Sequence, residues 1–190
     1  MNEATAVEKA NEIISLFKKF GNNDYIGENV SQIEHMTQCA ILAESEGHTE
    51  EVILGALLHD IGHLCEHLYQ VERMEHFGVV DHEEIGKKYL QQLGFSEKVT
   101  QMVVSHVNAK RYLTYKYPEY YEKLSVASKS TLEFQGGKMS EAEATEFEKN
   151  PDFNLYVSIR RWDDLAKQEE KEIPALEKYK QMIVAHLLSQ

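Results

Sequence analysis

The chain has 190 residues, a length that suits one domain with a single hydrophobic core, and we expect residues 1–190 to form that domain. Its formal net charge of −12 repels polyanions, which argues against nucleic acid as a partner. No apolar run approaches the length of a membrane span and the N-terminus lacks the features of a signal peptide, so we expect no membrane contact and a cytoplasmic location.

Helical periodicity dominates the chain. Apolar residues recur at spacings of three and four in nearly every segment and strand-like alternation is scarce, so the sequence predicts an all-α helical bundle. The expected helices cover residues 6–20, about 30–46, 50 through 63, 82–93, 97 towards 112, a later helix from 140 and a final one after Pro174. Ser96 is a plausible N-cap, and Ser140 with Glu143 a plausible capping box.

The two cysteines, Cys39 and Cys65, lie far apart in helical sequence. This spacing does not suggest a disulfide framework, and we expect both to be reduced and packed as small apolar side chains.

Five histidines and two aspartates stand out because imidazole and carboxylate are ligands for transition metals. In chain order they are His35, His59, Asp60, His63, His82, His106 and Asp163. Asp60 could bridge two ions while the adjacent His59 binds one of them, and His63 lies four residues on, one turn away on the same side of the predicted helix. The other histidines, His48, His67, His76 and His186, match no part of this pattern and are expected to be exposed or at helix boundaries.

His35 and His106 belong to separate predicted helices, each on or beside an apolar face. Both could therefore point into the centre of a bundle together with His59, and helical bundles commonly hold dimetal carboxylate sites in this way.

The pattern formed by His35, His59-Asp60 and Asp163 resembles the signature of the HD-domain superfamily, and His82 and His106 resemble the additions of its dinuclear branch. Further segments narrow the resemblance: residues 24–28, 32–35, 106–113, 128–137 and 159–163. Together they resemble the mixed-valence diiron oxygenases that cleave the carbon–phosphorus bond of hydroxylated aminoethylphosphonates and are related to myo-inositol oxygenase.

The resemblance implies a ligand set, with a metal core at about residues 25–163. One iron would be held by His35, His59, Asp60 and Asp163, and the other by His82, His106 and the bridging Asp60. Tyr25 would occupy the open position of the second iron before substrate arrives. The cofactor would be an Fe(II)/Fe(III) pair, with O2 as co-substrate, and no protein partner is implied.

The resemblance also implies a small phosphonate substrate. Lys110 lies one helical turn from His106, which places an ammonium beside the second metal. Ser128, Thr131 and Gln135 would supply neutral donors from one helical face, Glu28 would be the counterion of the substrate ammonium, and His63 would lie behind the metal ligands or bond the substrate. The products would be phosphate and glycine, or glycine betaine if the amine is trimethylated. The methylation state stays open, although the unmethylated amine is favoured, and Phe134 is a candidate wall for the amine.

Other functions remain open at this point. An HD-type metal-dependent phosphohydrolase acting on a small phosphoester would use the same His59-Asp60 pair but would not need Tyr25 or Glu28. A ligand-sensing module with a vestigial site and an inositol-type ring oxygenase are further alternatives. Oxygen dependence separates the oxygenase from the phosphohydrolase.

Overall fold

The computed structural model describes residues 1–25, 27–74 and 78–190, and this part of the chain is built from helices. It contains no β-strand beyond two isolated backbone bridges, Asp24 with Ser31 and Arg73 with Val79, so the predicted all-α class is confirmed. Among the described residues, no helix combines the length and the apolar character needed to cross a membrane.

The helices follow one another with short connections. They are α1 (Glu3–Phe20), α2 (Gln32–Ser45), α3 (Glu50–Leu58), α4 (Ile61–Leu64), the 3-10 helix η1 (Cys65–His67), α5 (His82–Leu93), α6 (Glu97–Lys116), α7 (Pro118–Lys123), α8 (Val126–Phe134), α9 (Glu141–Glu148), α10 (Phe153–Leu165) and α11 (Leu176–Ser189).

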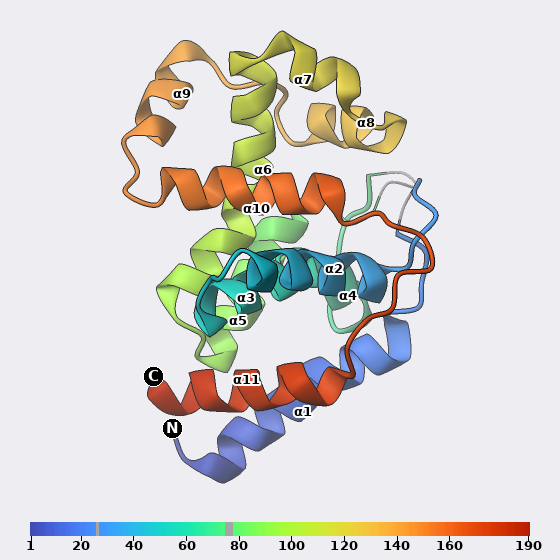
Figure 1. Ribbon diagram of the computed structural model, residues 1–190, viewed down its shortest axis with the longest axis vertical. Helices are drawn as coiled ribbons and strands as arrows, with labels where there is room; N and C mark the ends of the chain where they lie inside the picture. Colours follow the sequence, from blue (N-terminus) through green and yellow to red (C-terminus); the bar gives the residue numbers. More distant parts are fainter. Residues whose placement is uncertain (26, 75–77) are drawn as a thin grey trace.

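The helices form a central group with two flanking groups (Figure 1). In the centre α2 packs on α3, α6 packs on α3, α5 and α10, and α10 also crosses α2. The paired helices α1 and α11 cover one end and carry both chain termini, while α7, α8 and α9 lie at the opposite end. The elements that carry the candidate metal ligands therefore all belong to the central group.

One large apolar cluster joins the central helices to α1 and α11. Fully buried members include Phe17 of α1, Met36 of α2, Leu57 of α3, Trp162 of α10 and Tyr179 of α11. Cys39 and Cys65 are free and buried within this cluster, as the sequence predicts. A dense core of this kind holds side chains in defined rotamers, which keeps the positions of polar groups embedded in it fixed.

Capping interactions fix where several helices begin. Ser31 forms a capping box with Glu34 at the start of α2, one turn before His35. The predicted capping box of Ser140 with Glu143 and the predicted N-cap Ser96 are both present. These side chains satisfy backbone N–H groups that would otherwise lack partners in the first turn.

The prediction of one continuous helix through residues 59–63 is wrong. Helix α3 ends at Leu58, and Asp60 leaves helical geometry with φ −105° and ψ 12° before α4 begins at Ile61. His59 and Asp60 therefore occupy a break between two helices. Because of this break, His63 does not lie one turn above His59 on a shared helix face.

Helix α4 approaches α5 very closely because both contribute glycine at the contact. A Cβ atom on Gly62 would lie 1.8 Å from the carbonyl oxygen of His82, and one on Gly86 would lie 3.1 Å from the backbone nitrogen of Gly62. The absence of both side chains lets the α3–α4 junction, with Asp60, lie against the start of α5, where His82 is found.

Candidate metal centre

The Asp60 carboxylate lies between two pairs of imidazoles. Its Oδ2 atom is 3.4 Å from His35 Nε2 and 3.3 Å from His59 Nε2. Its Oδ1 atom is 3.4 Å from His82 Nε2 and 3.3 Å from His106 Nε2. All five side chains are buried, and they come from α2, the α3–α4 junction, α5 and α6. Each oxygen of one carboxylate thus faces its own histidine pair.

Backbone carbonyls orient three of the four imidazoles. The Nδ1 atoms donate to carbonyl oxygens: His35 to Ala166 at 3.0 Å, His59 to Ala56 at 2.8 Å and His106 to Val103 at 2.6 Å. The Nδ1 atom of His82 lies 3.3 Å from the Glu83 carboxylate. With the proton committed to Nδ1, each Nε2 presents a lone pair to the centre of the site, which is the orientation a metal ligand needs.

The separations between donor atoms suit metal ions. His35 Nε2 is 3.1 Å from His59 Nε2, and His82 Nε2 is 3.1 Å from His106 Nε2. Ligands at about 2.1 Å from a first-row metal are roughly 3.0 Å apart at octahedral and roughly 3.4 Å apart at tetrahedral angles. Every donor separation around Asp60 falls within or close to this range. Converging lone pairs repel one another, and a cation within each set removes that repulsion. The residues present therefore fit two metal ions.

Asp163 joins the set of His35 and His59. Its Oδ1 atom lies 3.4 Å from His35 Nε2, and its Oδ2 atom accepts a hydrogen bond of 2.7 Å from Arg160. Although burial acts in the opposite direction, the Arg160 guanidinium holds the pKa of Asp163 well below its usual range. The pKa of Asp60 is likewise lowered, against the effect of burial, by the imidazoles around it, His59 foremost. Both carboxylates are therefore ionised and able to bind metal.

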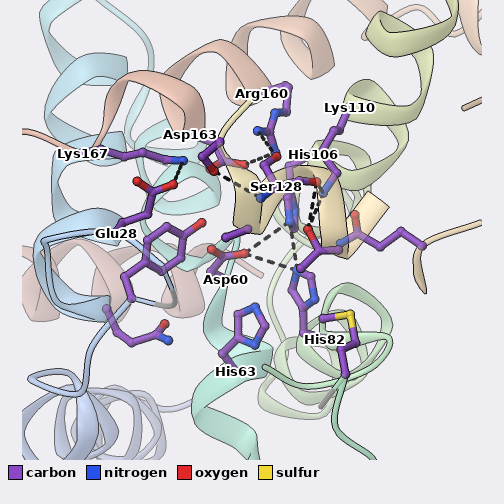
Figure 2. A pocket seen from close by; sticks show the side chains of 17 residues that line it. Glu28, Asp60, His63, His82, His106, Lys110, Ser128, Arg160, Asp163 and Lys167 are labelled. Atoms are coloured by element: carbon purple, nitrogen blue, oxygen red, sulfur yellow. Dashed lines mark hydrogen bonds and ion pairs between the residues drawn. The ribbon is translucent and has the colours of Figure 1, made fainter. Parts of the chain in front are cut away.

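A small cavity of about 60 Å³ opens beside this cluster (Figure 2). Its lining includes every predicted substrate-contacting residue, namely Glu28, His63, Lys110, Ser128, Thr131 and Gln135. Tyr25, Asp60, His82, His106 and Asp163 also reach it. The structure thus places the candidate metal ligands and the candidate substrate contacts around one space.

Lys110 is buried, and its ammonium has only neutral partners. Its Nζ donates to Thr131 Oγ1 at 2.9 Å and to the carbonyl oxygen of Ser128 at 3.4 Å. Burial, and after it the nearby Arg160, lowers the pKa of Lys110 to about 7. An anion entering the cavity would find here a cation that no carboxylate neutralises.

Helix α8 supplies two of the three predicted neutral donors. Ser128 and Thr131 lie within α8, one turn apart, whereas Gln135 follows the end of that helix as its C-cap residue. The Gln135 Oε1 atom is buried and has no hydrogen-bond partner among the described residues. Its side-chain amide is therefore free to contact a molecule in the cavity.

Tyr25 and His63 flank the metal cluster by ring stacking. The Tyr25 ring stacks on His35 with 3.8 Å between centroids, and the His63 ring stacks on His82 with 4.1 Å between centroids. Burial, followed by the charge of Asp163, raises the pKa of Tyr25, so the phenol stays protonated. Burial, followed by His82, lowers the pKa of His63, which keeps that imidazole neutral. The placement of Tyr25 at the second iron stays a prediction.

Glu28 does not lie free in the cavity. Its Oε1 atom accepts a hydrogen bond of 2.6 Å from Lys167, a residue that follows α10. Lys167 was not among the residues predicted from the sequence. The ion pair joins residues that are 139 positions apart, so no local spacing indicates it.

Arg160 is another cavity residue to which the sequence assigned no role. It is buried, donates to Asp163 and to Tyr120, forms an ion pair with Asp164, and reaches Ser128 Oγ at 3.5 Å. Its position one turn before Asp163 on α10 is the signal that could have identified it, because residues three apart on a helix share a face.

The remaining histidines lie away from the cluster. His67 stacks on Phe20, and His48 meets Trp162 edge-on. His186 is buried and accepts a hydrogen bond from the Ser96 N–H, which corrects the expectation that it is exposed or at a boundary. His76 lies outside the described residues. Phe134, the candidate wall, is 48% exposed and does not line the cavity, so this expectation is wrong.

Comparisons with known proteins agree with this geometry. The family model described as HD domain matches residues 33–149, a span that contains His35, His59, Asp60, His82 and His106. The chain is 43% identical, over 98% of its length and 85% of the relative, to an uncharacterized protein of Acanthamoeba polyphaga mimivirus.

Two relatives have named activities. The chain is 42% identical, over 84% of its length and 80% of the relative, to the glycine-betaine-forming 1-hydroxy-2-(trimethylamino)ethylphosphonate dioxygenase of Leisingera caerulea. It is 40% identical, over 92% of its length and 86% of the relative, to the hydroxymethylphosphonate dioxygenase of Gimesia maris. With the family match spanning residues 33–149 and these relatives covering most of the chain, the protein belongs to the HD domain family.

Proposed function

We propose that this protein is a diiron oxygenase that uses O2 to cleave the carbon–phosphorus bond of a small 1-hydroxyalkylphosphonate. The observation that carries the proposal is the Asp60 carboxylate, whose two oxygens each face an imidazole pair, beside a cavity that holds the buried ammonium of Lys110. Relatives of about 40% identity named as phosphonate dioxygenases support it.

The ligand assignment follows the two donor sets. His35, His59, Asp60 and Asp163 would hold one iron, and His82, His106 and Asp60 the other. Imidazole and carboxylate ligands suit iron in oxidation states II and III, although they also suit other first-row metals. When bound, the iron pair would supply the redox chemistry with O2.

The protein residues would bind and orient the substrate. Lys110 would donate charge-assisted hydrogen bonds to the phosphonate, and Ser128, Thr131 and Gln135 would bind its remaining oxygens. Arg160 lies beside Ser128 and would add positive charge at the same end of the cavity. His63, held neutral, is placed to hydrogen-bond the substrate, and Tyr25 covers the His35 side of the cavity.

The overall reaction balances without a further reductant. One 1-hydroxyalkylphosphonate and one O2 give one carboxylic acid and one phosphate, with the carbon–phosphorus bond broken and the carbon oxidised. With 2-amino-1-hydroxyethylphosphonate, the substrate favoured by the sequence, the acid would be glycine. With hydroxymethylphosphonate it would be formate.

Oxygen dependence tests the proposal. The iron-loaded protein is mixed with 2-amino-1-hydroxyethylphosphonate, hydroxymethylphosphonate or a small phosphoester, in air and under strict anaerobiosis, and phosphate is measured. We expect phosphate from at least one hydroxyphosphonate in air and none under nitrogen. Equal release from the phosphoester under both gases would favour the phosphohydrolase, and less than two metal ions per chain in protein from iron-replete cells would contradict the dinuclear site.

A further inference from the structure

Glu28 and Lys167 form an ion pair at one side of the cavity. The Lys167 ammonium donates to Glu28 Oε1 at 2.6 Å, and the side chains are only 21% and 16% exposed. In Figure 2 the pair lies on the other side of Asp60 from Lys110. A ligand whose phosphonate is bound by Lys110 would therefore extend its other end towards Glu28 and Lys167.

The backbone around Lys167 is held in place on both sides. The Ala166 carbonyl accepts from His35 Nδ1 at 3.0 Å. The Gln168 N–H donates to Gln38 Oε1 at 3.0 Å, and Gln38 Nε2 donates back to the Gln168 carbonyl at 2.9 Å. Lys167 is thus positioned by α2 and is not a mobile surface lysine.

The charges around the cavity are already matched, with one exception. Arg160 pairs with Asp163 and Asp164, the Asp60 carboxylate faces four imidazoles, and Glu28 pairs with Lys167. Lys110 alone has neutral partners. Among the described lining residues, the cavity therefore offers a free cation to an anionic ligand but no carboxylate that lacks a cation.

Size and surface chemistry point in the same direction. A space of about 60 Å³ holds roughly four to six water molecules, at about 10–15 Å³ each, which suits a ligand of few atoms. A quaternary ammonium prefers a cage of aromatic faces. Apart from imidazoles, Tyr25 is the only aromatic ring among the described residues that line the cavity.

We propose that Lys167 determines substrate specificity by occupying the ammonium position opposite Glu28, so that the cavity prefers 1-hydroxyalkylphosphonates without an amine to aminated ones. This inference rests on the proposed function. An aminated ligand has to break the Glu28–Lys167 pair and place a second cation beside Lys167, whereas hydroxymethylphosphonate leaves the pair intact. Replacing Lys167 by an uncharged side chain would return Glu28 to the role of counterion for the ligand.

Binding under nitrogen tests the inference without turnover. Calorimetry would compare hydroxymethylphosphonate with 2-amino-1-hydroxyethylphosphonate on the iron-loaded wild type, on Lys167→Met and on Lys171→Met. Lys171 is a matched control because it belongs to the same segment and forms no ion pair in the described part of the chain. We expect the wild type and the control to bind the amine-free compound at least about tenfold more tightly, and Lys167→Met to shift the ratio by at least about tenfold towards the amine.

Two further variants keep the test interpretable if Lys167→Met folds poorly. Lys167→Arg retains the cation and should keep the wild-type ratio, whereas Glu28→Gln should still reject the amine because Lys167 then lacks its counterion. The inference is overturned if the wild type binds the aminated compound as tightly, if neither compound binds, or if folded Lys167→Met keeps the wild-type ratio. Failure of both compounds to release phosphate in air would instead defeat the proposed function and leave the binding ratios as the measure of Lys167.

Discussion

At the scale of single residues, Asp60 has a different position from every other candidate ligand. Its two oxygens face two histidine pairs, whereas Asp163 approaches only the pair formed by His35 and His59. The two aspartates should therefore respond differently to the same substitution.

Asp60→Asn should reduce bound iron to nearly zero, because the amide removes the negative charge shared by both ions. Asp163→Asn should leave about one iron per chain, bound at His82 and His106. Metal analysis of both variants after loading checks this, with circular dichroism to confirm that each is folded. Equal iron content in the two variants would contradict the bridging role of Asp60.

Lys110 should make activity depend on pH. Since burial lowers its pKa to about 7, the ammonium is present below that pH and is lost as the pH rises. We expect kcat/KM for a hydroxyphosphonate to fall as the pH rises through about 7, because the anion then loses its cation. In Lys110→Arg the guanidinium stays charged, so the profile should be flat from about pH 6.5 to 9. The same decline in that variant would assign the titration to another group.

These residue positions were predictable to different degrees. Lys110 was found because the four-residue spacing from His106 places two side chains on one helix face. The partner of Glu28 was not, because Lys167 comes close only through the packing of the segment after α10 on α2. The Gln38 and His35 bonds that hold this segment likewise join positions about 130 residues apart.

At the scale of elements, helices with clear apolar periodicity and recognisable caps were predictable. The expected range 82–93 matches α5, and the Ser140 capping box begins α9. The break at Asp60 was not, because the apolar run continues through Leu57, Leu58 and Ile61 without Gly or Pro before the break. Helix α10 was also not predicted from periodicity, although its sequence contributes Arg160 and Asp163.

The contact between α4 and α5 gives a prediction at this scale. In Gly62→Ala the new methyl group would meet the His82 carbonyl oxygen, so α5 must shift and carry the His82 ring with it. We expect a loss of about 1–3 kcal/mol in unfolding free energy and a greater loss of iron from the His82 and His106 set than from the other set. Urea unfolding and metal analysis measure the two effects.

Gly47→Ala provides the control for Gly62→Ala. Gly47 has a φ of +76°, and a Cβ atom placed on it would meet no other atom within 4 Å, so alanine there adds backbone strain without displacing a ligand. It should cost about 1 kcal/mol and leave iron content unchanged. Iron retained in Gly62→Ala, or lost equally in both variants, would contradict the link between this contact and His82.

At the scale of the whole molecule, the candidate ligands come from five segments that meet only in the folded chain. They lie on α2, the α3–α4 junction, α5, α6 and α10. Residue types and order identified the ligand candidates, but which helices lie side by side depends on packing that local patterns do not encode. The pairing of His35 with His59, and of His82 with His106, could be argued from the resemblance and not from spacing.

Metal binding should stabilise the folded chain, because ligands from separate helices bind the ions only when they are assembled. At a hundredfold excess over the dissociation constant, one bound ion contributes about 2.7 kcal/mol, which corresponds to an increase in Tm of about 5–11 °C for a chain of this size. Thermal unfolding under nitrogen, with Fe(II) and with a chelator, measures the shift. Asp60→Asn should show almost none, and an equal shift in that variant would indicate iron bound elsewhere.

The carbonyl bonds of His59 and His106 have a consequence for how the protein acquires its metal in the cell. Each imidazole donates to the carbonyl three residues before it, so its orientation arises together with its own stretch of backbone. Maturation should then need only delivery of ferrous ions to chains that have already left the ribosome and folded. No insertion chaperone would be required, and purified metal-free protein should recover its centre on simple addition of a ferrous salt.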